Sequence, residues 1–323
     1  MKRFLCIAVA LSMLLSAAAL FSGCSGDSAS KEYPVTIGSV TIDKEPENIV
    51  VLSDDLADII SYIGYDVKMV GRSIECDQEF LSVVPSVGSA DNPSIDTITG
   101  YGTDLVLADD TLSEKSRQKL EAEGVPVISM VKAESMDELK VLYTNLGTVL
   151  GGNVTGHKIG EDAYEELIST IKSLRGTVSN DIVKTSAYLY IEQNGQLYTF
   201  PSGSIEATLF GYSGALNVFE NQQGPAVNAE ELRMATPSFI FCDSQEVIDY
   251  LNNDEALSNM TALKTDHVLI IPLSDFSRQG VTYEQIVYTM IDAMFVEHDD
   301  ASPDENAPEE SRIQPGEIAG ELE

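Results

Sequence analysis

The stretch that decides the fold is TGHKIGEDAYEELISTIKSL, residues 155–174. Its apolar side chains, among them Ile159, Leu167 and Ile171, recur at helical intervals, which predicts one amphipathic helix. A helix of about 20 residues spans about 30 Å, roughly the width of a small domain. We therefore expect this helix to be a stiff strut that holds apart two separately cored halves of the chain.

Short apolar runs alternate with helical patterns on either side of this strut. The first run, residues 48–52, ends at a Ser/Asp cluster that caps a predicted helix through Ile63. Alternation of strand and helix is typical of a parallel sheet covered by helices, so we predict an α/β fold with parallel-rich sheets. The other predicted strands are residues 67–71, 104–108, 125–130, 186–191, 197–200, 238–242 and 267–271, and the other predicted helices are residues 113–123, 136–150, 204–212, 245–251 and 282–295.

The beginning of the chain joins a basic start to a long apolar run, which predicts a bacterial export signal over residues 1–23. The run ends in Phe21-Ser22-Gly23-Cys24, which resembles the lipobox of bacterial lipoproteins. Cys24 is therefore the predicted lipidation site and would hold the protein outside the cytoplasm on the cell membrane. An ordinary secretory signal with cleavage nearby is the alternative. The remaining predicted segments are a tether and first folded residues at 24–45, an N-terminal lobe at 46–152, the linking helix at 153–178, a C-terminal lobe at 179–296 and an acidic tail at 297–323.

The chain is strongly acidic, with 52 Asp and Glu against 19 Lys and Arg and a formal net charge of -33. This charge repels nucleic acids and anionic membrane surfaces, so neither is expected as a partner, and membrane contact is expected through the lipid alone. Part of the charge lies in residues 297–323, where acids and prolines alternate with little to bury. We predict that this tail is disordered and solvated.

The 4 cysteines do not form a disulfide framework. Cys6 leaves with the signal and Cys24 is the lipidation candidate, so Cys76 and Cys242 remain in the folded part. The sequence leaves open whether these two cysteines pair, stay free or contact a ligand.

Several short motifs occur in a specific order between residues 46 and 295. They are PENIVVL (46–52), PSVG (85–88), PSID (93–96), TDLVL (103–107), LEAEGVPV (120–127), GALNV (214–218) and TPSFI (236–240). In order and spacing they resemble the helical-backbone (class III) substrate-binding proteins of ABC importers, which carry iron-siderophores, haem and cobalamin. The resemblance implies two Rossmann-like lobes joined by one long backbone helix, with a ligand cleft between the lobes. It also implies a monomeric carrier that is not an enzyme, holds no cofactor of its own and delivers its ligand to an ABC permease dimer with its ATPase.

In this family one acidic residue on each lobe docks into the permease. By position in the motifs these residues are Asp96 and Glu230, and Glu231 is the rival of Glu230. Two charges of the same sign at matched positions suit electrostatic recognition. The alternative is that both acids only stabilise the starts of helices.

The ligand site of such a fold lies beyond the carboxyl ends of the strands. Arg72 and Arg278 are candidates because a guanidinium binds carboxylates or phosphates in a bidentate manner, although ion pairs with acids such as Asp109 or Asp275 explain them equally well. Cys76 is either a ligand contact or inert packing. The full set of predicted ligand-binding residues is Ser53, Asp54, Arg72, Cys76, Asp109, Asp110, Phe200, Ser202, Asp243, Phe276 and Arg278.

Other classes of protein have weaker support. The only histidines, His157, His267 and His298, are scattered, which does not favour a bare transition-metal receptor. The sequence lacks the common hydrolase, zinc-protease and nucleotide-binding motifs, so an enzyme is not favoured. A ligand sensor for a signalling partner would have the same sequence features. The ligand stays open among iron chelates, haem and corrinoids, with a slight preference for neutral or cationic ones because of the acidic cleft residues.

Overall fold

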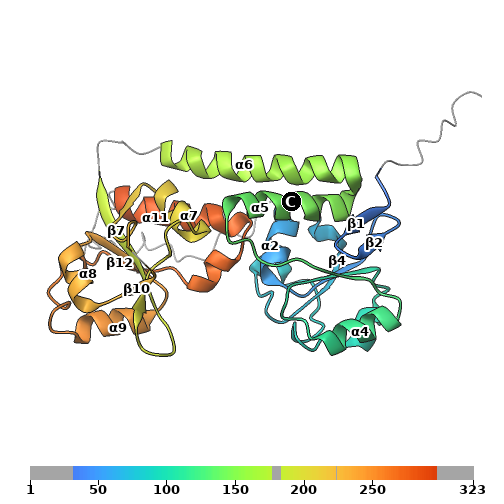
Figure 1. Cartoon of the computed structure of the whole chain (residues 1–323), viewed down its shortest axis with the longest axis horizontal. Helices are drawn as coiled ribbons and strands as arrows, with labels where there is room; N and C mark the ends of the chain where they lie inside the picture. The colour runs from blue at the N-terminus through green and yellow to red at the C-terminus, as the bar shows by residue number, and fades with distance from the viewer. Residues whose placement is uncertain (1–31, 177–182, 223, 297–323) are drawn as a thin grey trace, which may run out of the picture.

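The N-terminal lobe is built on a four-stranded parallel sheet with the strand order β4-β3-β5-β6. A computed structural model describes residues 32–176, 183–222 and 224–296 of the chain (Figure 1). The central strands β3 and β5 are buried along their whole length, which explains why they are continuous apolar runs. The strands are β3 (Ile49–Val51), β4 (Met69–Arg72), β5 (Leu105–Ala108) and β6 (Val127–Ser129).

Helices cover both faces of this sheet, and serine residues fix where they begin. The side chains of Ser53, Ser94 and Ser113 each accept a hydrogen bond from a backbone N–H in the first turn of the following helix. A β-hairpin that the sequence did not predict precedes the sheet. The elements are β1 (Val35–Ile37), β2 (Val40–Ile42), α2 (Asp54–Tyr62), α3 (Ile95–Gly100) and α4 (Glu114–Ala122), with short 3-10 turns η1 (Asp66–Lys68) and η2 (Glu79–Leu81).

The C-terminal lobe has a mixed sheet with the order β10-β8-β7-β11-β12, and β9 pairs with the first part of β7. Its core strands β7, β11 and β12 are parallel, as predicted, whereas β8 returns antiparallel to β7 after the turn at Asn194 and Gly195. The strands are β7 (Lys184–Ile191), β8 (Leu197–Tyr198), β9 (Ala215–Asn217), β10 (Ala226–Val227), β11 (Phe239–Cys242) and β12 (Val268–Ile270). The helices are α7 (Ile205–Tyr212), α8 (Ala229–Ala235), α9 (Gln245–Asn253), α10 (Thr261–Lys264) and α11 (Val281–Phe295), with a 3-10 turn η4 (Leu273–Ser277).

A helical hairpin connects the lobes. Helix α5 (Met136–Gly151) lies in the N-terminal lobe, one π-helical turn η3 (Gly152–Gly156) reverses the chain, and α6 (His157–Gly176) runs back over both lobes (Figure 1). The predicted backbone helix is therefore present. The two helices approach so closely that a Cβ atom on Gly160 would lie 2.2 Å from the carbonyl oxygen of Tyr143. Glycine, which has no Cβ atom, allows this approach.

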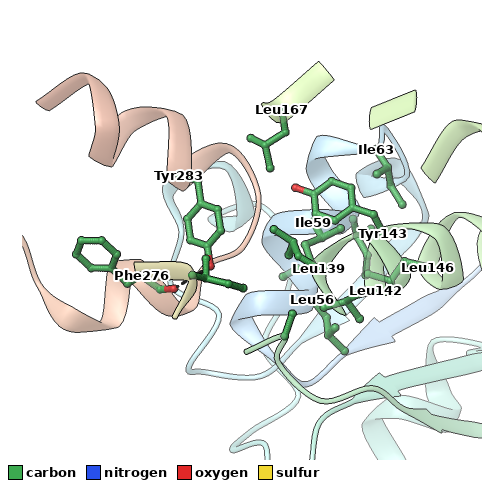
Figure 2. Packing of buried hydrophobic residues seen from close by; sticks show 14 of the residues in the cluster. Leu56, Ile59, Ile63, Leu139, Leu142, Tyr143, Leu146, Leu167, Phe276 and Tyr283 are labelled. Carbon is green, nitrogen blue, oxygen red and sulfur yellow. Dashed lines mark hydrogen bonds between the residues drawn. The ribbon is translucent and has the colours of Figure 1, made fainter. Parts of the chain in front are cut away.

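The hydrophobic core does not follow the predicted division into two separately cored halves. One cluster of buried residues runs from α2 and α5 through α6 into α11 and so belongs to both lobes (Figure 2). In this cluster Leu167 of α6 packs with Tyr143 on one side and Tyr283 on the other. There are two further clusters, and each lies within one lobe, on the outer face of that lobe's sheet. The lobes thus share one core along the side formed by these helices, and they are separate only on the side away from α6.

Buried hydrogen bonds complete this fused side, which we call the helix seam: α2, α5, α6 and α11. The hydroxyl of Tyr143 donates to the carbonyl of Gln279 at 2.8 Å, and the Gln279 amide exchanges two hydrogen bonds with the backbone of Ala133 at 2.9 and 2.7 Å. Asp58 of α2 accepts from the backbone N–H of Gly280 at 2.8 Å and so caps α11 of the other lobe. These contacts fix the angle between the lobes near the strut.

Several predictions fall on residues outside the described ranges: the export signal at 1–23, the lipidation site Cys24, the first part of the tether and the tail at 297–323. Among the described residues, no helix is both long and apolar enough to span a lipid bilayer.

Candidate functional site

A cavity of about 620 Å³ lies between the two lobes. The N-terminal lobe contributes the segment after β6, from Lys132 to Glu134, and the C-terminal lobe contributes residues from the ends of β7, β8 and β12. This is the edge of the sheets where open α/β folds bind ligands. The lining residues from the C-terminal lobe include Tyr190, Phe200, Ser202, Glu206, Leu273 and Ser277.

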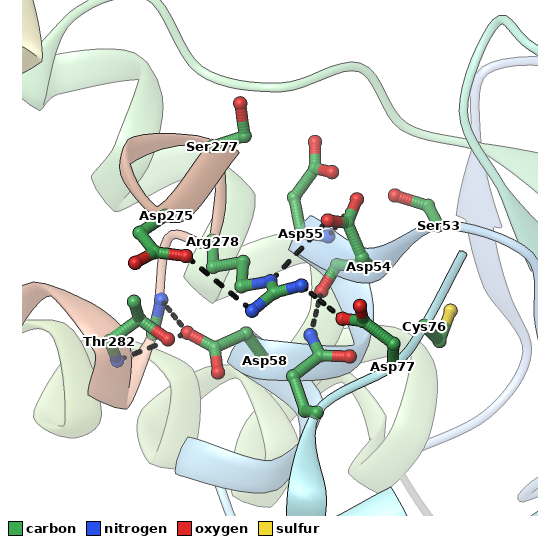
Figure 3. A network of polar contacts seen from close by, with 12 residues as sticks. Ser53, Asp54, Asp55, Asp58, Cys76, Asp77, Asp275, Ser277, Arg278 and Thr282 are labelled. Carbon is green, nitrogen blue, oxygen red and sulfur yellow. Dashed lines mark hydrogen bonds and ion pairs between the residues drawn. The ribbon is translucent and has the colours of Figure 1, made fainter. Parts of the chain in front are cut away.

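Arg278 lies at the boundary of the lobes and is surrounded by carboxylates (Figure 3). Its Nε lies 3.5 Å from Asp54 Oδ2, its Nη1 lies 3.6 Å from Asp275 Oδ1, and its Nη2 donates to Asp77. Asp54 and Asp77 belong to the N-terminal lobe, so the arginine connects the lobes. An ion pair with Asp275 was one of the expected alternatives for Arg278, and the structure contains it.

Lys132 makes the reverse connection. Its ammonium lies 3.4 Å from Glu206 Oε1 and 3.3 Å from the hydroxyl of Ser277, both in the C-terminal lobe. Each lobe therefore offers one cation to acids or hydroxyls of the other lobe across the cleft.

The start of α2 places three aspartates beside this boundary. Burial and the adjacent Asp54 raise the pKa of Asp55 to about 7, so that Asp55 holds its proton at a pH where an exposed aspartate has lost it. Burial also raises the pKa of Asp58, which is fully buried and whose Oδ1 has no hydrogen-bond partner among the described residues. The local surroundings thus contain more carboxylate groups than cations.

Arg72 is not directed into the cleft. Its guanidinium donates to the carbonyl oxygens of Leu81, Val84 and Ser73 at 3.0, 3.1 and 3.1 Å. The side chain holds the segment after β4 in place, and the expected pair with Asp109 does not occur in the structure. A direct ligand contact for Arg72 stays a prediction.

Cys76 and Cys242 are both free and buried. The Cys76 thiol lies 3.4 Å from the hydroxyl of Ser73, and burial raises its pKa to about 11. Burial raises the pKa of Cys242 to about 11 as well. Neither thiol ionises near neutral pH, and the thiolate is the form that binds metals. The surroundings of both cysteines therefore favour a packing role over metal or ligand binding.

The predicted ligand residues Phe200 and Phe276 belong to a packed aromatic cluster. Phe200 stacks on Tyr188 with ring centres 4.1 Å apart, and Phe276 meets both rings edge to face. Phe276 is fully buried, whereas Phe200 lines the cavity. Of these three rings, that of Phe200 is the one that lines the cavity and can contact a guest.

The remaining predicted ligand residues, except Ser202, are not among those that line the cavity. Ser53 is the buried cap of α2, and the carboxylate of Asp109 accepts a hydrogen bond from the backbone of Thr111 at 2.7 Å next to exposed Asp110. Asp243 accepts from the backbone N–H of Leu273 at 2.6 Å and so fixes the loop after β12. Their roles toward a ligand stay predictions.

Lys132 and Glu206, which line the cavity, were not predicted from the sequence. A signal for Lys132 existed, because it follows the predicted strand 125–130 in a chain poor in basic residues, the same reason that favoured Arg72. Glu206 had no such signal, because it lies within a predicted helix and meets Lys132 only through the arrangement of the lobes.

The docking candidates Asp96 and Glu230 are both exposed in the first turn of a helix, in α3 and α8. Glu231, the rival, is used locally, because its carboxylate accepts from the backbone N–H of Asn228 in a capping box. Glu230 pairs with Arg233 at 2.6 Å, and this pair lowers its pKa. Both glutamates are exposed, and each has a local partner.

No group of three or more His, Cys, Asp or Glu side chains in the described ranges is arranged to hold a metal ion. His157 contacts Thr148 and His267 stacks on Phe239, while His298 lies outside these ranges.

The sequence of the chain matches one protein family over most of the folded region. Residues 49–274 match the periplasmic binding protein family. The chain belongs to this family. Its members are carriers and not enzymes, as expected here, and this chain is a substrate-binding protein of an ABC importer, in agreement with the resemblance of its motifs.

Three similar proteins illustrate the family. An uncharacterised ABC transporter substrate-binding lipoprotein, YvrC of Bacillus subtilis (strain 168), is 25% identical over 229 residues, which cover 65% of this chain and 72% of the relative. The Fe(3+)-citrate-binding protein YfmC of the same organism is 24% identical over 289 residues, which cover 80% of this chain and 87% of the relative. The crystal structure of the periplasmic haem-binding protein HutB of Vibrio cholerae has a TM-score of 0.62 at 13% identity and covers 76% of this chain and 97% of that structure. The structural similarity supports the two-lobed fold.

Proposed function

We propose that this protein is an extracytoplasmic lipoprotein, attached to the bacterial membrane through Cys24, that captures an iron chelate, haem or a corrinoid. It delivers this ligand to an ABC permease dimer with its ATPase. The family, the apolar start before Cys24 and relatives named for substrate binding, Fe(3+)-citrate and haem support the proposal.

The observation that carries the proposal is the cavity of about 620 Å³ between the lobes. It receives residues from both lobes and lies at the carboxyl ends of the strands. A volume of this size falls within the usual range of small-molecule sites, roughly 300–1,000 Å³. The helix seam holds the far side together, so a ligand can enter only where the lobes are separate.

A thermal-shift panel of iron chelates, haem and corrinoids on the full mature chain tests the ligand assignment. A ligand at 100 times its Kd stabilises the folded state by about 2.7 kcal/mol, which raises the Tm measurably. We expect Ser202→Trp, which fills the cavity, to abolish the shift, and Asn252→Trp on α9 outside the lining to preserve it. If every compound leaves the Tm of the parent chain unchanged, the chelate and corrinoid assignment is wrong.

Docking through Asp96 and Glu230 completes the proposal. Both carboxylates are exposed and each stands on a different lobe, so a permease with basic residues at matching positions can contact both at once. Reversal of both charges, Asp96→Lys with Glu230→Lys, should abolish uptake by cells while ligand affinity of the isolated protein stays the same. Normal uptake by the doubly reversed protein would rule out these residues as the docking pair.

A further inference from the structure

Every cation that lines the cleft is already held by acids. The charged lining residues of the cavity are Lys132, Glu134 and Glu206. A second cavity of about 480 Å³ adjoins Arg278 and is lined by acids that include Asp58, Glu79 and Asp275. Among the described residues that line these two cavities, Lys132 and Arg278 are the only Lys, Arg or His side chains. An anionic ligand in the cleft would therefore depend on Lys132 and Arg278 for its charge partners.

The guanidinium of Arg278 is enclosed by three carboxylates. Each of its three nitrogens faces a different carboxylate: Nε faces Asp54, Nη1 faces Asp275 and Nη2 faces Asp77 (Figure 3). The Arg278 side chain is only 18% exposed, and its Nε lies close to Asp54 but has no hydrogen-bond partner among the described residues. A chelate that carries carboxylates would need the forked edge that binds such groups in a bidentate manner. In Arg278 that edge already faces carboxylates.

Lys132 is neutralised in the same way from the opposite side. Its ammonium contacts Glu206, whose side chain is 18% exposed, and Ser277. Glu206 therefore offsets the charge of Lys132 at the cavity wall, and an anionic ligand would meet this carboxylate beside the ammonium.

Beyond these pairs the second cavity has buried acceptor atoms without partners among the described residues. Asp58 Oδ1 and the side-chain oxygen of Gln78 are buried, line the second cavity and have no hydrogen-bond partner among the described residues. Gln78 is turned so that its amide nitrogen donates to the carbonyl of Asp54 at 2.8 Å. Unpartnered buried oxygens favour a guest that brings N–H or O–H donors.

We propose that the three carboxylates around Arg278 set the charge specificity of the cleft, so that it takes a neutral or cationic, donor-bearing ligand and rejects anionic chelates. This inference rests on the proposed function and narrows its ligand class. An anionic chelate meets acids that already hold the cations, whereas amide or ammonium groups meet acceptors that lack donors. By this inference the chain differs from the relative that is named for Fe(3+)-citrate.

Three probes of different charge test the inference on the full mature chain by isothermal titration calorimetry: ferric citrate as an anion, cyanocobalamin as a neutral corrinoid and ferrioxamine B as a cation. We expect either or both of the last two to bind at least about 100-fold more tightly than ferric citrate, since like charges at a site suppress the wrong partner.

The double substitution Asp54→Asn with Asp77→Asn then releases two of the three nitrogens of Arg278. We expect its affinity for ferric citrate to rise at least about tenfold, and a further Arg278→Gln substitution should remove this gain. The control is Asp43→Asn with Asp66→Asn, which changes the net charge equally at exposed positions outside the cleft. Circular dichroism and the Tm of each variant verify folding.

The outcomes separate the inference from the function. If the parent chain binds ferric citrate as tightly as the other two probes, or if the cleft double variant gains no more than its control, the charge inference is wrong while the carrier function stands. If the parent chain binds none of the three probes, the chelate and corrinoid function itself is contradicted.

Discussion

The two lobes touch in two regions of different chemistry, the helix seam and the cleft. In the seam, residues such as Leu167, Tyr143 and Tyr283 are fully buried and belong to one apolar cluster. In the cleft the contacts are ion pairs whose partners are exposed to different degrees, from 18% for the Arg278 side chain to 70% for Asp77. Separating the lobes at the seam would expose buried apolar surface to water, which costs free energy. An ion pair in contact with water can open at little cost. The seam therefore sets the permanent geometry and the cleft is the side that a ligand can part.

The largest effect is expected in the seam, where α5 and α6 approach through glycine. Gly160→Ala would place a Cβ atom 2.2 Å from the carbonyl oxygen of Tyr143, and helix backbone on both sides prevents relaxation. We expect a loss of at least about 3 kcal/mol in the free energy of unfolding, measured by urea denaturation, because overpacking against backbone cannot be relieved by a rotamer change.

Gly211→Ala is the matched control for this prediction. Gly211 lies in α7, and a Cβ atom there would meet nothing within 4 Å. Removal of a helical glycine at an open position should stabilise the fold by about 0.5–1 kcal/mol. If Gly160→Ala lowers the free energy of unfolding while Gly211→Ala raises it, close packing of the helical hairpin, and not helix propensity, dominates at Gly160. If both substitutions change the free energy of unfolding in the same direction, the account of the seam is contradicted.

An intermediate effect is expected at Asp55, which lies between the two regions. Its pKa rises from 3.8 to about 7 on folding, chiefly through burial. Between about pH 4 and pH 7 the unfolded chain loses this proton while the folded chain keeps it, so the free energy of unfolding falls as the pH rises. A shift of this size is worth at most about 4 kcal/mol, and we expect about 2 kcal/mol.

Asp55→Asn should remove this loss. We expect the variant to gain stability over the parent chain at pH 8 but not at pH 4, as measured by chemical denaturation at both values. Asp66→Asn, an exposed aspartate in η1, is the control and should change neither value by more than about 0.5 kcal/mol. A stability difference between Asp55→Asn and the parent chain that is the same at both pH values would refute the raised pKa.

The seam and the cleft also differ in how far the sequence predicts them. Helix α6 and its apolar face were predictable because Ile159, Leu167 and Ile171 repeat with the helical period, and the parallel strands were predictable because they are buried on both faces. The three-residue strands of the β1–β2 hairpin were not predicted, since such short segments show no period. The periodicity also did not reveal that the apolar face of α6 would merge the cores of both lobes.

In the cleft the sequence indicated residue types but not their partners. Arg278 was a candidate because it follows a strand, and its enclosure by Asp54 and Asp77 depends on residues more than 200 positions away in the chain. Arg72 satisfied the same sequence rule and yet donates to backbone carbonyls. Position after a strand places a side chain near the sheet edge, but the fold of the following loop decides where that side chain points.

The smallest effect on stability is expected at Lys132, and it provides the closest comparison between the regions. Lys132 pairs with Glu206 across the cleft at 3.4 Å, and Lys140 pairs with Glu161 and Glu165 of α6 at 3.3 and 3.4 Å, with side chains of similar exposure, 36% and 41%. Lys132→Gln and Lys140→Gln should each lower the free energy of unfolding by about 1 kcal/mol or less, and less still at high salt. Of the two substitutions, only Lys132→Gln should increase hydrogen exchange in residues 131–134 and 200–206, because the ion pair of Lys132 crosses the cleft and those of Lys140 do not. The hydrogen-bonded seam beside Ala133 limits this opening to the cleft side. If Lys140→Gln loosens the same segments equally, the cleft ion pairs have no separate role in holding the lobes together.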